Sequence, residues 1–283
     1  LMKKAVISID VEDWYHLEYF KGNLNDKSQS VLDEGTNAFI NIISSENIKA
    51  TFFVVGELIS SKLELLADIG NQGHEIAGHS FHHIRPLTQS IKEFKVDSKK
   101  LLVELKERLN ITDPGYRAPC FSLDDARLKI LKELNFSYDS SKISAGFHPL
   151  YGSINIDDYT KISDNVFANG SFTEFELPTQ RFLGKNVPIS GGGYLRILPW
   201  FLFKYLLKKY LRENDTYFFF IHPFELTNKN VSLPKDSSIT ARLRFRIGRS
   251  KGASRFSRLI KILKKEGFEF ETFADFNKEV NNL

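Results

Sequence analysis

Two histidines four residues apart, His79 and His83 in the run H-S-F-H-H, have side chains that could hold one divalent metal ion. On a turn of helix both imidazoles would face the same way, within reach of one ion. A carboxylate from the run D-V-E-D, which contains Asp10, Glu12 and Asp13, would add a third protein ligand and leave a position for water. A polar loop with hydrogen-bonded histidines explains the pair alone equally well, but the carboxylate run favours a metal site that activates water.

Side chains of catalytic type follow five of the predicted strands. In chain order they are Asp10, Glu12 and Asp13 at the end of strand 5–10, His79 and His83 after 75–78, Arg117 within 115–118, Asp139 at the end of 136–139, and His222 after 217–221. The active sites of (β/α) barrels are built where the carboxyl ends of the strands meet. These groups are therefore expected to lie together at one face of the fold.

Seven or eight predicted strands, rich in β-branched and aromatic residues, alternate with helical segments along the chain. Further strands are expected at 50–55, 174–177 and 268–272, and helices at 36–46, 58–72, 90–109, 124–134, 200–212 and 254–265. Buried strands separated by helices indicate a mostly parallel sheet. Neither G-x-G-x-x-G nor a P-loop pattern is present, which favours an irregular (β/α) barrel of the TIM kind over an open nucleotide-binding sheet. We expect a single α/β domain over residues 1–283, with loop insertions near 142–170 and 227–252.

The composition argues against several classes of protein. The 283 residues are 42% hydrophobic and 26% charged, an ordinary globular balance that argues against disorder. A net charge of only +4 gives no reason to expect nucleic-acid binding, and no apolar run approaches the roughly 20 residues of a membrane span. The single cysteine, Cys120, excludes an intramolecular disulfide, and no signal peptide precedes the first strand, so a cytoplasmic location is expected.

Four motifs together resemble the polysaccharide deacetylases, the family with the NodB-like or carbohydrate esterase family 4 domain. They are D-V-E-D-W, R-A-P-C-F-S, the glycine triplet at 191–193 with Tyr194, and I-H-P-F. More narrowly, they are similar to a bacterial branch associated with exopolysaccharide and O-antigen loci, itself similar to peptidoglycan deacetylases and allantoinase-like proteins. The resemblance implies an irregular barrel and one divalent metal ion, held by an aspartate and by His79 and His83. Zinc is the expected ion, with cobalt and nickel as alternatives.

The resemblance also implies catalytic roles for three further residues. Asp10 matches the general base that takes a proton from the attacking water, and Arg117 matches the arginine that orients this base. His222 matches the histidine that protonates the leaving amine as general acid. Backbone N–H groups near Cys120 would help to stabilise the tetrahedral oxyanion.

The first motif departs from the usual family pattern, which has two adjacent aspartates and a glycine. Here the run reads Asp10, Val11, Glu12, Asp13. Glu12 shares the strand parity of Asp10 and is the metal ligand if the strand continues. Asp13 becomes the ligand if the chain turns after Val11.

Four residues are candidates for contacting the sugar. Trp14 would offer an aromatic face to a pyranose ring, with a loop packed against the barrel rim as the alternative. Cys120 and Phe121 follow the arginine motif and are expected beside the site. Tyr194 follows the glycine triplet, which is either a substrate-facing loop or a plain tight turn.

The segment 237–265 carries ten cationic residues and no acidic ones. They are Arg242, Arg244, Arg246, Arg249, Lys251, Arg255, Arg258, Lys261, Lys264 and Lys265. A solvated basic face is the default interpretation. The functional alternatives are an anion site for phosphate-bearing glycan donors, or peripheral contact of the 242–265 run with an acidic membrane surface.

The sequence therefore predicts a metal-dependent hydrolase of a C–N bond. Its expected reaction is removal of an acetyl group from an N-acetylated sugar, in a cell-surface polysaccharide or in an activated sugar precursor. An allantoinase-like cyclic amide hydrolase is the second hypothesis, and a non-catalytic carbohydrate-binding relative is the third. Retention of Asp10, both metal histidines, Arg117 and His222 argues against the third.

Overall fold

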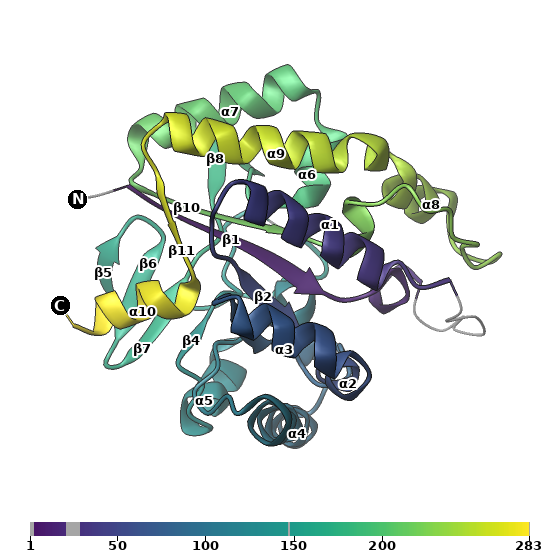
Figure 1. The fold of residues 1–283 in the computed structure, drawn as a ribbon. Coiled ribbons are helices and arrows are strands. Elements are labelled where there is room, and N and C mark those ends of the chain that lie inside the picture. The colour runs from purple at the N-terminus through teal and green to yellow at the C-terminus, as the bar shows by residue number, and fades with distance from the viewer. Residues whose placement is uncertain (1–2, 21–28, 147, 283) are drawn as a thin grey trace.

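A parallel sheet forms the centre of the computed structural model, which describes residues 3–20, 29–146 and 148–282 (Figure 1). Strands β10 (Thr216–Ile221), β1 (Lys4–Val11), β2 (Thr51–Val54) and β3 (Glu75–Gly78) lie side by side in that order and run parallel. A further strand, β11 (Glu269–Glu271), pairs in parallel with the first part of β1. The carboxyl ends of the central strands consequently lie at one face, where the catalytic-type residues follow them.

Beyond β3 the sheet continues through single-residue bridges. Tyr116 bridges Gly78 on one side and Asp139 on the other, so the predicted strand 115–118 contributes only one paired residue. Asp139 ends β4 (Tyr138–Asp139), which pairs in parallel with β7 (Phe172–Phe175). Antiparallel pairs join β7 to β6 (Val166–Asn169), β6 to β5 (Thr160–Ser163), and β8 (Thr179–Phe182) to β9 (Lys185–Pro188). The protein therefore has the α/β fold with an irregular barrel that the sequence predicts.

Helices cover the outside of this sheet. Their bounds are α1 (Leu32–Ser45), α2 (Gly56–Ile59), α3 (Leu63–Asn71), α4 (Ile91–Leu109), α5 (Asp125–Glu133), α6 (Gly192–Ile197), α7 (Trp200–Glu213), α8 (Ile239–Arg246), α9 (Arg249–Lys265) and α10 (Phe273–Asn281). The predicted helix 58–72 is divided into α2 and α3 by a 3-10 turn at Ser60–Lys62. Helices α1 and α9 lie side by side (Figure 1), and the rings of Phe39 and Phe256 stack between them with centroids 5.4 Å apart. Among the described residues, no helix is both long and apolar enough to cross a membrane.

Strand β1 is buried on both faces and divides its side chains between two environments. Ile7 packs into the large core cluster that includes Phe39 of α1. Val6 belongs to a second cluster on the other face of the strand. Because side chains alternate along a strand, Ser8 and Asp10 share the face of Val6. This alternation places the Asp10 carboxylate inside the barrel, at the carboxyl end of the strand.

The region 142–170, predicted to be an irregular insertion, contains the hairpin formed by β5 and β6. Asp164 and Asn165 make its turn, and Asn165 has a φ of 59°. Asparagine tolerates this left-handed conformation better than most residues do, so the D-N pair is a turn signal. The expectation of irregular backbone was therefore wrong for 160–169, where the strands are too short to stand out in the sequence, whereas the described residues of 142–159 form no helix or strand.

The region 227–252, also predicted to be a loop insertion, contains helix α8 and the start of α9. The Ser238 hydroxyl caps α8 by accepting the N–H of Ala241 at 3.2 Å. Ala241 and Phe245, four residues apart, are buried. The arginines between them hide this short apolar periodicity, which explains the missed helix.

Candidate active site

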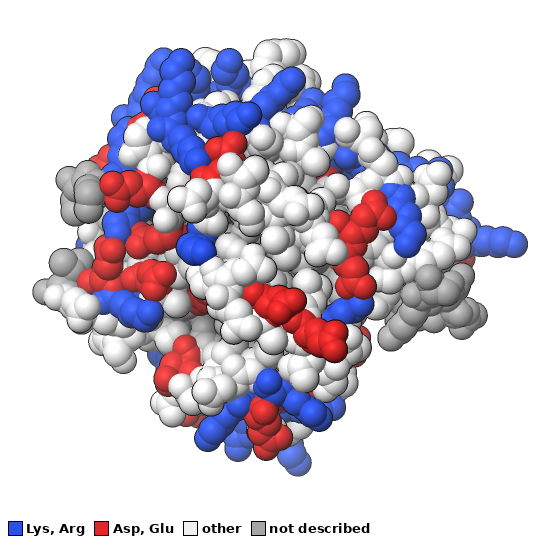
Figure 2. Space-filling model, viewed as in Figure 1, with Lys and Arg blue, Asp and Glu red and all other residues white. Residues whose placement is uncertain are grey.

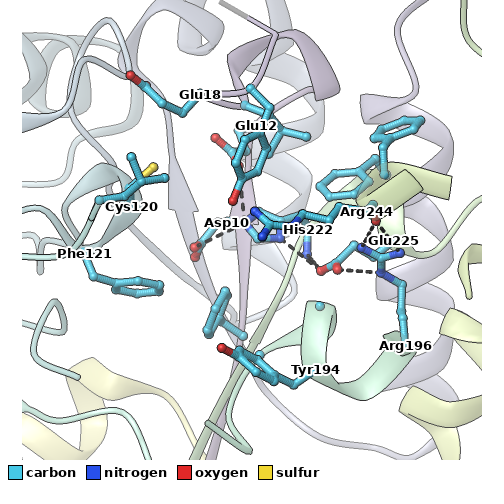
Figure 3. Close-up of a pocket in the computed structure, with 18 of the residues that line it drawn as sticks. Asp10, Glu12, Glu18, Cys120, Phe121, Tyr194, Arg196, His222, Glu225 and Arg244 are labelled. Carbon is cyan, nitrogen blue, oxygen red and sulfur yellow. Dashed lines mark hydrogen bonds and ion pairs between the residues drawn. The ribbon is translucent and has the colours of Figure 1, made fainter. Parts of the chain in front are cut away.

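A cavity of about 470 Å³ lies where the carboxyl ends of β1, β3 and β10 meet (Figure 3). Five of the residues predicted to bind the metal or to transfer protons line it, namely Asp10, Glu12, His79, His83 and His222. Arg117 lies behind Asp10 and is fully buried. The fold thus brings together the residues that the sequence places after separate strands.

Arg117 holds the carboxylate of Asp10 in place. Its Nη1 donates to Asp10 Oδ1 at 2.7 Å and to Ser8 Oγ at 2.9 Å, and its Nη2 donates to Ser140 Oγ at 3.0 Å. The guanidinium carbon lies 4.0 Å from the centre of the Phe53 ring. A buried guanidinium–carboxylate pair with several other hydrogen bonds has little orientational freedom. Asp10 is therefore presented to the cavity in a fixed orientation.

The two histidines after β3 come together through a turn and not on a helix. Ser80 and His83 have φ values of 62° and 53°, so the predicted helical arrangement is wrong. Asp97 of α4 braces the turn by accepting from Ser80 Oγ at 2.9 Å and from the N–H of Phe81 at 2.8 Å. The imidazole rings of His79 and His83 consequently lie with their centroids 4.9 Å apart.

Glu12, His79 and His83 form a buried donor set that suits a divalent metal ion. One ligand atom from each residue lies within 4.8 Å of the others. His79 Nδ1 pairs with the carbonyl oxygen of Arg117 at 2.8 Å, which leaves Nε2 as the ligand atom. Burial lowers the pKa of His79 to about 4, so this imidazole is neutral, as a ligand must be. Burial alone would raise the pKa of Glu12, but its hydrogen bond and electrostatic interaction with His83, together with the charge of His222, lower it well below its usual value.

The structure distinguishes between the two carboxylates that the sequence left open. Asp13 Oδ1 accepts the N–H of Trp14 at 2.8 Å and the N–H of Val31 at 3.2 Å, so Asp13 caps a short 3-10 helix. Glu12, and not Asp13, shares the donor set with the histidines. Trp14 is buried, its ring centroid 6.0 Å from that of Phe20, and it does not line the cavity. The expectation that Trp14 contacts a sugar was therefore wrong, because the cap turns its ring into the core.

His222 belongs to a chain of charged groups that the sequence did not reveal. Its Nδ1 lies 3.0 Å from Glu225 Oε2, and Arg196 Nε donates to Glu225 Oε1 at 2.7 Å (Figure 3). His222 Nε2 lies 3.3 Å from Glu12 Oε1 and 4.0 Å from Asp10 Oδ2. Burial opposes the charged imidazole, but Glu225, Glu12 and Asp10 raise the pKa of His222 to about 9. The imidazole nitrogen that faces the cavity therefore carries a proton at neutral pH.

Cys120 and Phe121 form one wall of the cavity, as predicted from their place in the chain. Both have left-handed backbone, with φ values of 54° and 53°, in the 3-10 turn Pro119–Phe121. The Phe121 ring lies edge to face against Phe220, with centroids 5.0 Å apart. Its N–H donates to the carbonyl of Ala118 at 2.9 Å, so this turn uses one of the predicted oxyanion donors.

The glycine triplet and Tyr194 border the cavity from α6. Gly191, Gly193 and Tyr194 line it. None of the three glycines has left-handed backbone, so a tight turn does not explain them. A Cβ atom on Gly192 would lie 2.1 Å from Glu225 Oε2. Glycine is therefore needed here so that the helix can approach the carboxylate that pairs with His222.

Comparisons with known families match two parts of the chain. Residues 23–138 match the family described as polysaccharide deacetylase, and residues 140–277 match a domain of unknown function, DUF3473. Over residues 23–138, the chain matches a polysaccharide deacetylase domain. Similar proteins include a peptidoglycan deacetylase of Helicobacter pylori, 23% identical over 193 residues, and chitin deacetylase 1 of Cryptococcus neoformans var. grubii, 31% identical over 97 residues. These matches cover 68% and 33% of this chain but only 62% and 21% of the relatives, so the chain spans less than two thirds of either.

Solved structures of the same family share the fold of the deacetylase domain. One from Mycobacterium smegmatis, assigned to the polysaccharide deacetylases, has a TM-score of 0.59 at 17% identity and covers 100% of this chain and 92% of its own. A family 4 pseudoenzyme from Bacillus anthracis has a TM-score of 0.56 at 14% identity, covering 98% and 66%. Because the fold serves a pseudoenzyme as well, function must be argued from the side chains.

The two matched regions build the cavity together. His79, His83 and Arg117 lie in the deacetylase region, Tyr194, Arg196, His222 and Glu225 lie in the region of unknown function, and Asp10 and Glu12 precede both. Sequence reasoning missed Glu225 and Arg196, although Glu225 follows His222 by three residues with Pro223 between them. That spacing is typical of a capped helical start, and the cap is present in the structure.

Proposed function

We propose that this protein hydrolyses the amide C–N bond of an N-acetylated sugar in a cell-surface glycan or its precursor, with a divalent metal ion. One observation carries the proposal: the donor set of Glu12, His79 and His83 shares one cavity with a carboxylate oriented by Arg117 and with an imidazole paired with Glu225. The relatives named for peptidoglycan and chitin support an N-acetylated glycan as the substrate class.

Zinc is the ion that we expect Glu12, His79 and His83 to hold. One carboxylate and two imidazoles are a common catalytic zinc set that leaves room for water. When bound, the ion would polarise the acetyl carbonyl and make water a nucleophile at neutral pH. The hydrogen bond from His79 Nδ1 to the Arg117 carbonyl orients the ring for this role.

The remaining residues divide the proton transfers between them. Asp10, held by Arg117, takes a proton from the attacking water. His222 donates a proton to the nitrogen, because an amine leaves readily only when it is protonated. Glu225 holds His222 through Nδ1, so that Nε2 faces the cavity. The base thus lies on β1, and the acid directly follows the neighbouring strand β10.

Acetate release from N-acetylated oligosaccharides tests the proposal. We expect acetate and a free amine to appear in equal amounts, with no ring opening of allantoin. Opening of allantoin without acetate release would favour the allantoinase-like alternative. Binding of the oligosaccharides without acetate release would favour a non-catalytic relative.

A further inference from the structure

The ten cations of the segment 237–265 do not form one basic face. Blue side chains are spread along α7 and α9 at the top of the view and over α8 at the right (Figure 2). Several of the arginines brace the backbone. Arg242 Nη2 donates to the carbonyl of Pro234 at 2.8 Å, Arg249 Nε donates to that of Phe224 at 2.9 Å, and Arg255 Nη1 donates to those of Leu195, Arg196 and Leu198 at 2.7–2.9 Å. The guanidinium groups of these three arginines therefore stabilise the fold through hydrogen bonds to backbone carbonyls.

Arg244 differs from the other nine because it lines the cavity. It lies on α8, on the side of the cavity away from Cys120 and Phe121 (Figure 3). Its guanidinium carbon is 5.6 Å from the centre of the Tyr19 ring. Among the described residues, its guanidinium donates no hydrogen bond and forms no ion pair. Its planar set of N–H donors is therefore available to a ligand.

The carboxylates that line the same cavity all have other partners. Asp10 pairs with Arg117, Glu12 with His83, Glu18 with Arg85, and Glu225 with Arg196 and His222. Within the part of the chain that the structure describes, no cavity carboxylate therefore pairs with Arg244. Aromatic side chains line the same cavity, including those of Tyr19, Tyr151, Tyr194 and Phe245. Arg244 itself is exposed at the edge of this cavity.

Two residues on other elements lie within the electrostatic reach of Arg244. Burial lowers the pKa of His148, and the charge of Arg244 lowers it further. Burial raises the pKa of Tyr194, and Arg244 opposes that rise. The charge of Arg244 therefore reaches His148 and Tyr194, two residues that line the cavity.

We propose that Arg244 forms a subsite for an anionic group on the sugar substrate, a phosphate or a carboxylate, while the acetamide lies between Asp10 and His222. This inference rests on the proposed function and narrows its substrate class. The cavity volume of about 470 Å³ suits one charged sugar unit, since small-molecule sites span roughly 300–1,000 Å³. A guanidinium binds either anion through paired N–H donors.

The test compares one neutral substrate with two substrates that carry an anionic group at different positions of the same sugar. They are the methyl glycoside of N-acetylglucosamine, N-acetylglucosamine 1-phosphate, and the methyl glycoside with a carboxylate at C6. We expect Arg244→Gln to raise KM for at least one charged substrate by about tenfold or more and to leave the neutral one unchanged. Arg244→Lys should give an intermediate KM, because it keeps the charge but loses the paired donors. The charged substrate whose KM rises in Arg244→Gln shows whether the subsite binds a phosphate or a carboxylate.

Arg246→Gln is the matched control, because Arg246 is exposed on the same helix and does not line the cavity. It should leave all three KM values unchanged. Equal KM changes for neutral and charged substrates in Arg244→Gln, or no change for any, would overturn the subsite.

Calorimetric binding to metal-stripped protein separates this inference from the proposed function. N-acetylglucosamine 1-phosphate and the C6 carboxylate are titrated without metal, because phosphate also binds metal ions. The subsite requires that at least one of them binds, and that Arg244→Gln weakens this binding about tenfold or more. Weakening without any acetate release would contradict the deacetylase proposal alone. Unchanged binding in Arg244→Gln, or no binding of either anion, would contradict the subsite alone.

Discussion

Two buried groups of carboxyls in this protein have opposite surroundings. At the cavity, Asp10 and Glu225 each pair with an arginine at 2.7 Å. Behind it, Asp139 of β4 and Glu174 of β7 pair with each other, on neighbouring parallel strands. Both groups are almost completely buried. The difference teaches that burial alone does not decide whether a carboxyl is charged, since the partner decides it.

The paired acids behind the cavity share a proton. Burial raises the pKa of Asp139 to about 6, and burial together with the charge of Asp139 raises the pKa of Glu174 far above its usual value. Without a proton, Glu174 Oε2 would have no hydrogen-bond partner. With one, it donates to Asp139, which in turn accepts from the Ser141 hydroxyl at 2.8 Å. The Ser141 oxygen accepts the N–H of Ala118, so this pair of acids, which holds one proton, braces the segment after Arg117.

Replacing one acid in each group should produce the largest contrast in activity. Asp10→Asn should keep the metal and lower kcat by a factor on the order of 10²–10⁴, the usual contribution of a general base. Glu174→Gln should stay close to the wild-type kcat, because an amide can still donate a hydrogen bond to Asp139. Steady-state kinetics and metal analysis of both variants check this. A wild-type kcat in Asp10→Asn would remove Asp10 from the mechanism.

The second contrast is between Glu12 and Asp13, the two carboxylates that could have bound the metal. Glu12→Gln should weaken metal binding by more than the roughly 10–100-fold typical of residues that only orient a ligand. Asp13→Asn should retain the metal, because an amide oxygen can still cap the short helix. Metal content after dialysis against a weak chelator distinguishes the two. Loss of metal in Asp13→Asn alone would mean that the chain turns differently after Val11.

A smaller effect on kcat is expected from replacing Glu225, the residue that pairs with the proposed general acid His222. Glu225→Gln should lower kcat by about tenfold and leave the metal content unchanged, because His222 keeps its place but loses a charged partner. Tyr194→Phe, which changes another residue of the cavity wall, is the control and should preserve kcat within a few-fold. An unchanged kcat in Glu225→Gln would show that His222 needs no orientation from this side.

The smallest effect concerns stability and not activity. Asp139 and Glu174 have raised pKa values in the folded protein, so the folded state binds more protons than the unfolded state above about pH 4. Their contribution therefore decreases as the pH rises from about 4 through 6 and beyond. Glu174→Gln should flatten this decrease and make the variant more stable than the wild type at pH 8, by about 1–3 kcal/mol. Urea unfolding of both proteins across this pH range measures the difference, and parallel curves would contradict the shared proton.

Much of the fold and site was predictable because it depends on local pattern. The apolar runs of β1, β2 and β10 identify buried strands, and the polar residues just after them identify the face that carries the site. The choice between Glu12 and Asp13 was not predictable, because strand parity loses its meaning once the chain turns. The same holds for the turn at His79, which Asp97 of a later helix braces.

The basic segment shows a second limit of the sequence. Its charge pattern is plain, but the pattern does not say which guanidinium reaches a backbone carbonyl and which reaches the cavity. Arg242 and Arg244 are only two residues apart, but Arg242 donates to the carbonyl of Pro234 and Arg244 lines the cavity, because helix α8 turns them in different directions. The ion pair of Arg196 with Glu225 likewise joins segments that only the tertiary fold brings together.

Metal content and acetate release, measured on the same sample before and after chelation, test the central claim most directly. The account predicts one divalent ion for each chain, loss of turnover when the ion is removed, and recovery with zinc or cobalt. His79→Ala should not recover under the same treatment, whereas His222→Ala should regain the metal without regaining activity. Full turnover by protein shown to be free of metal would contradict the account.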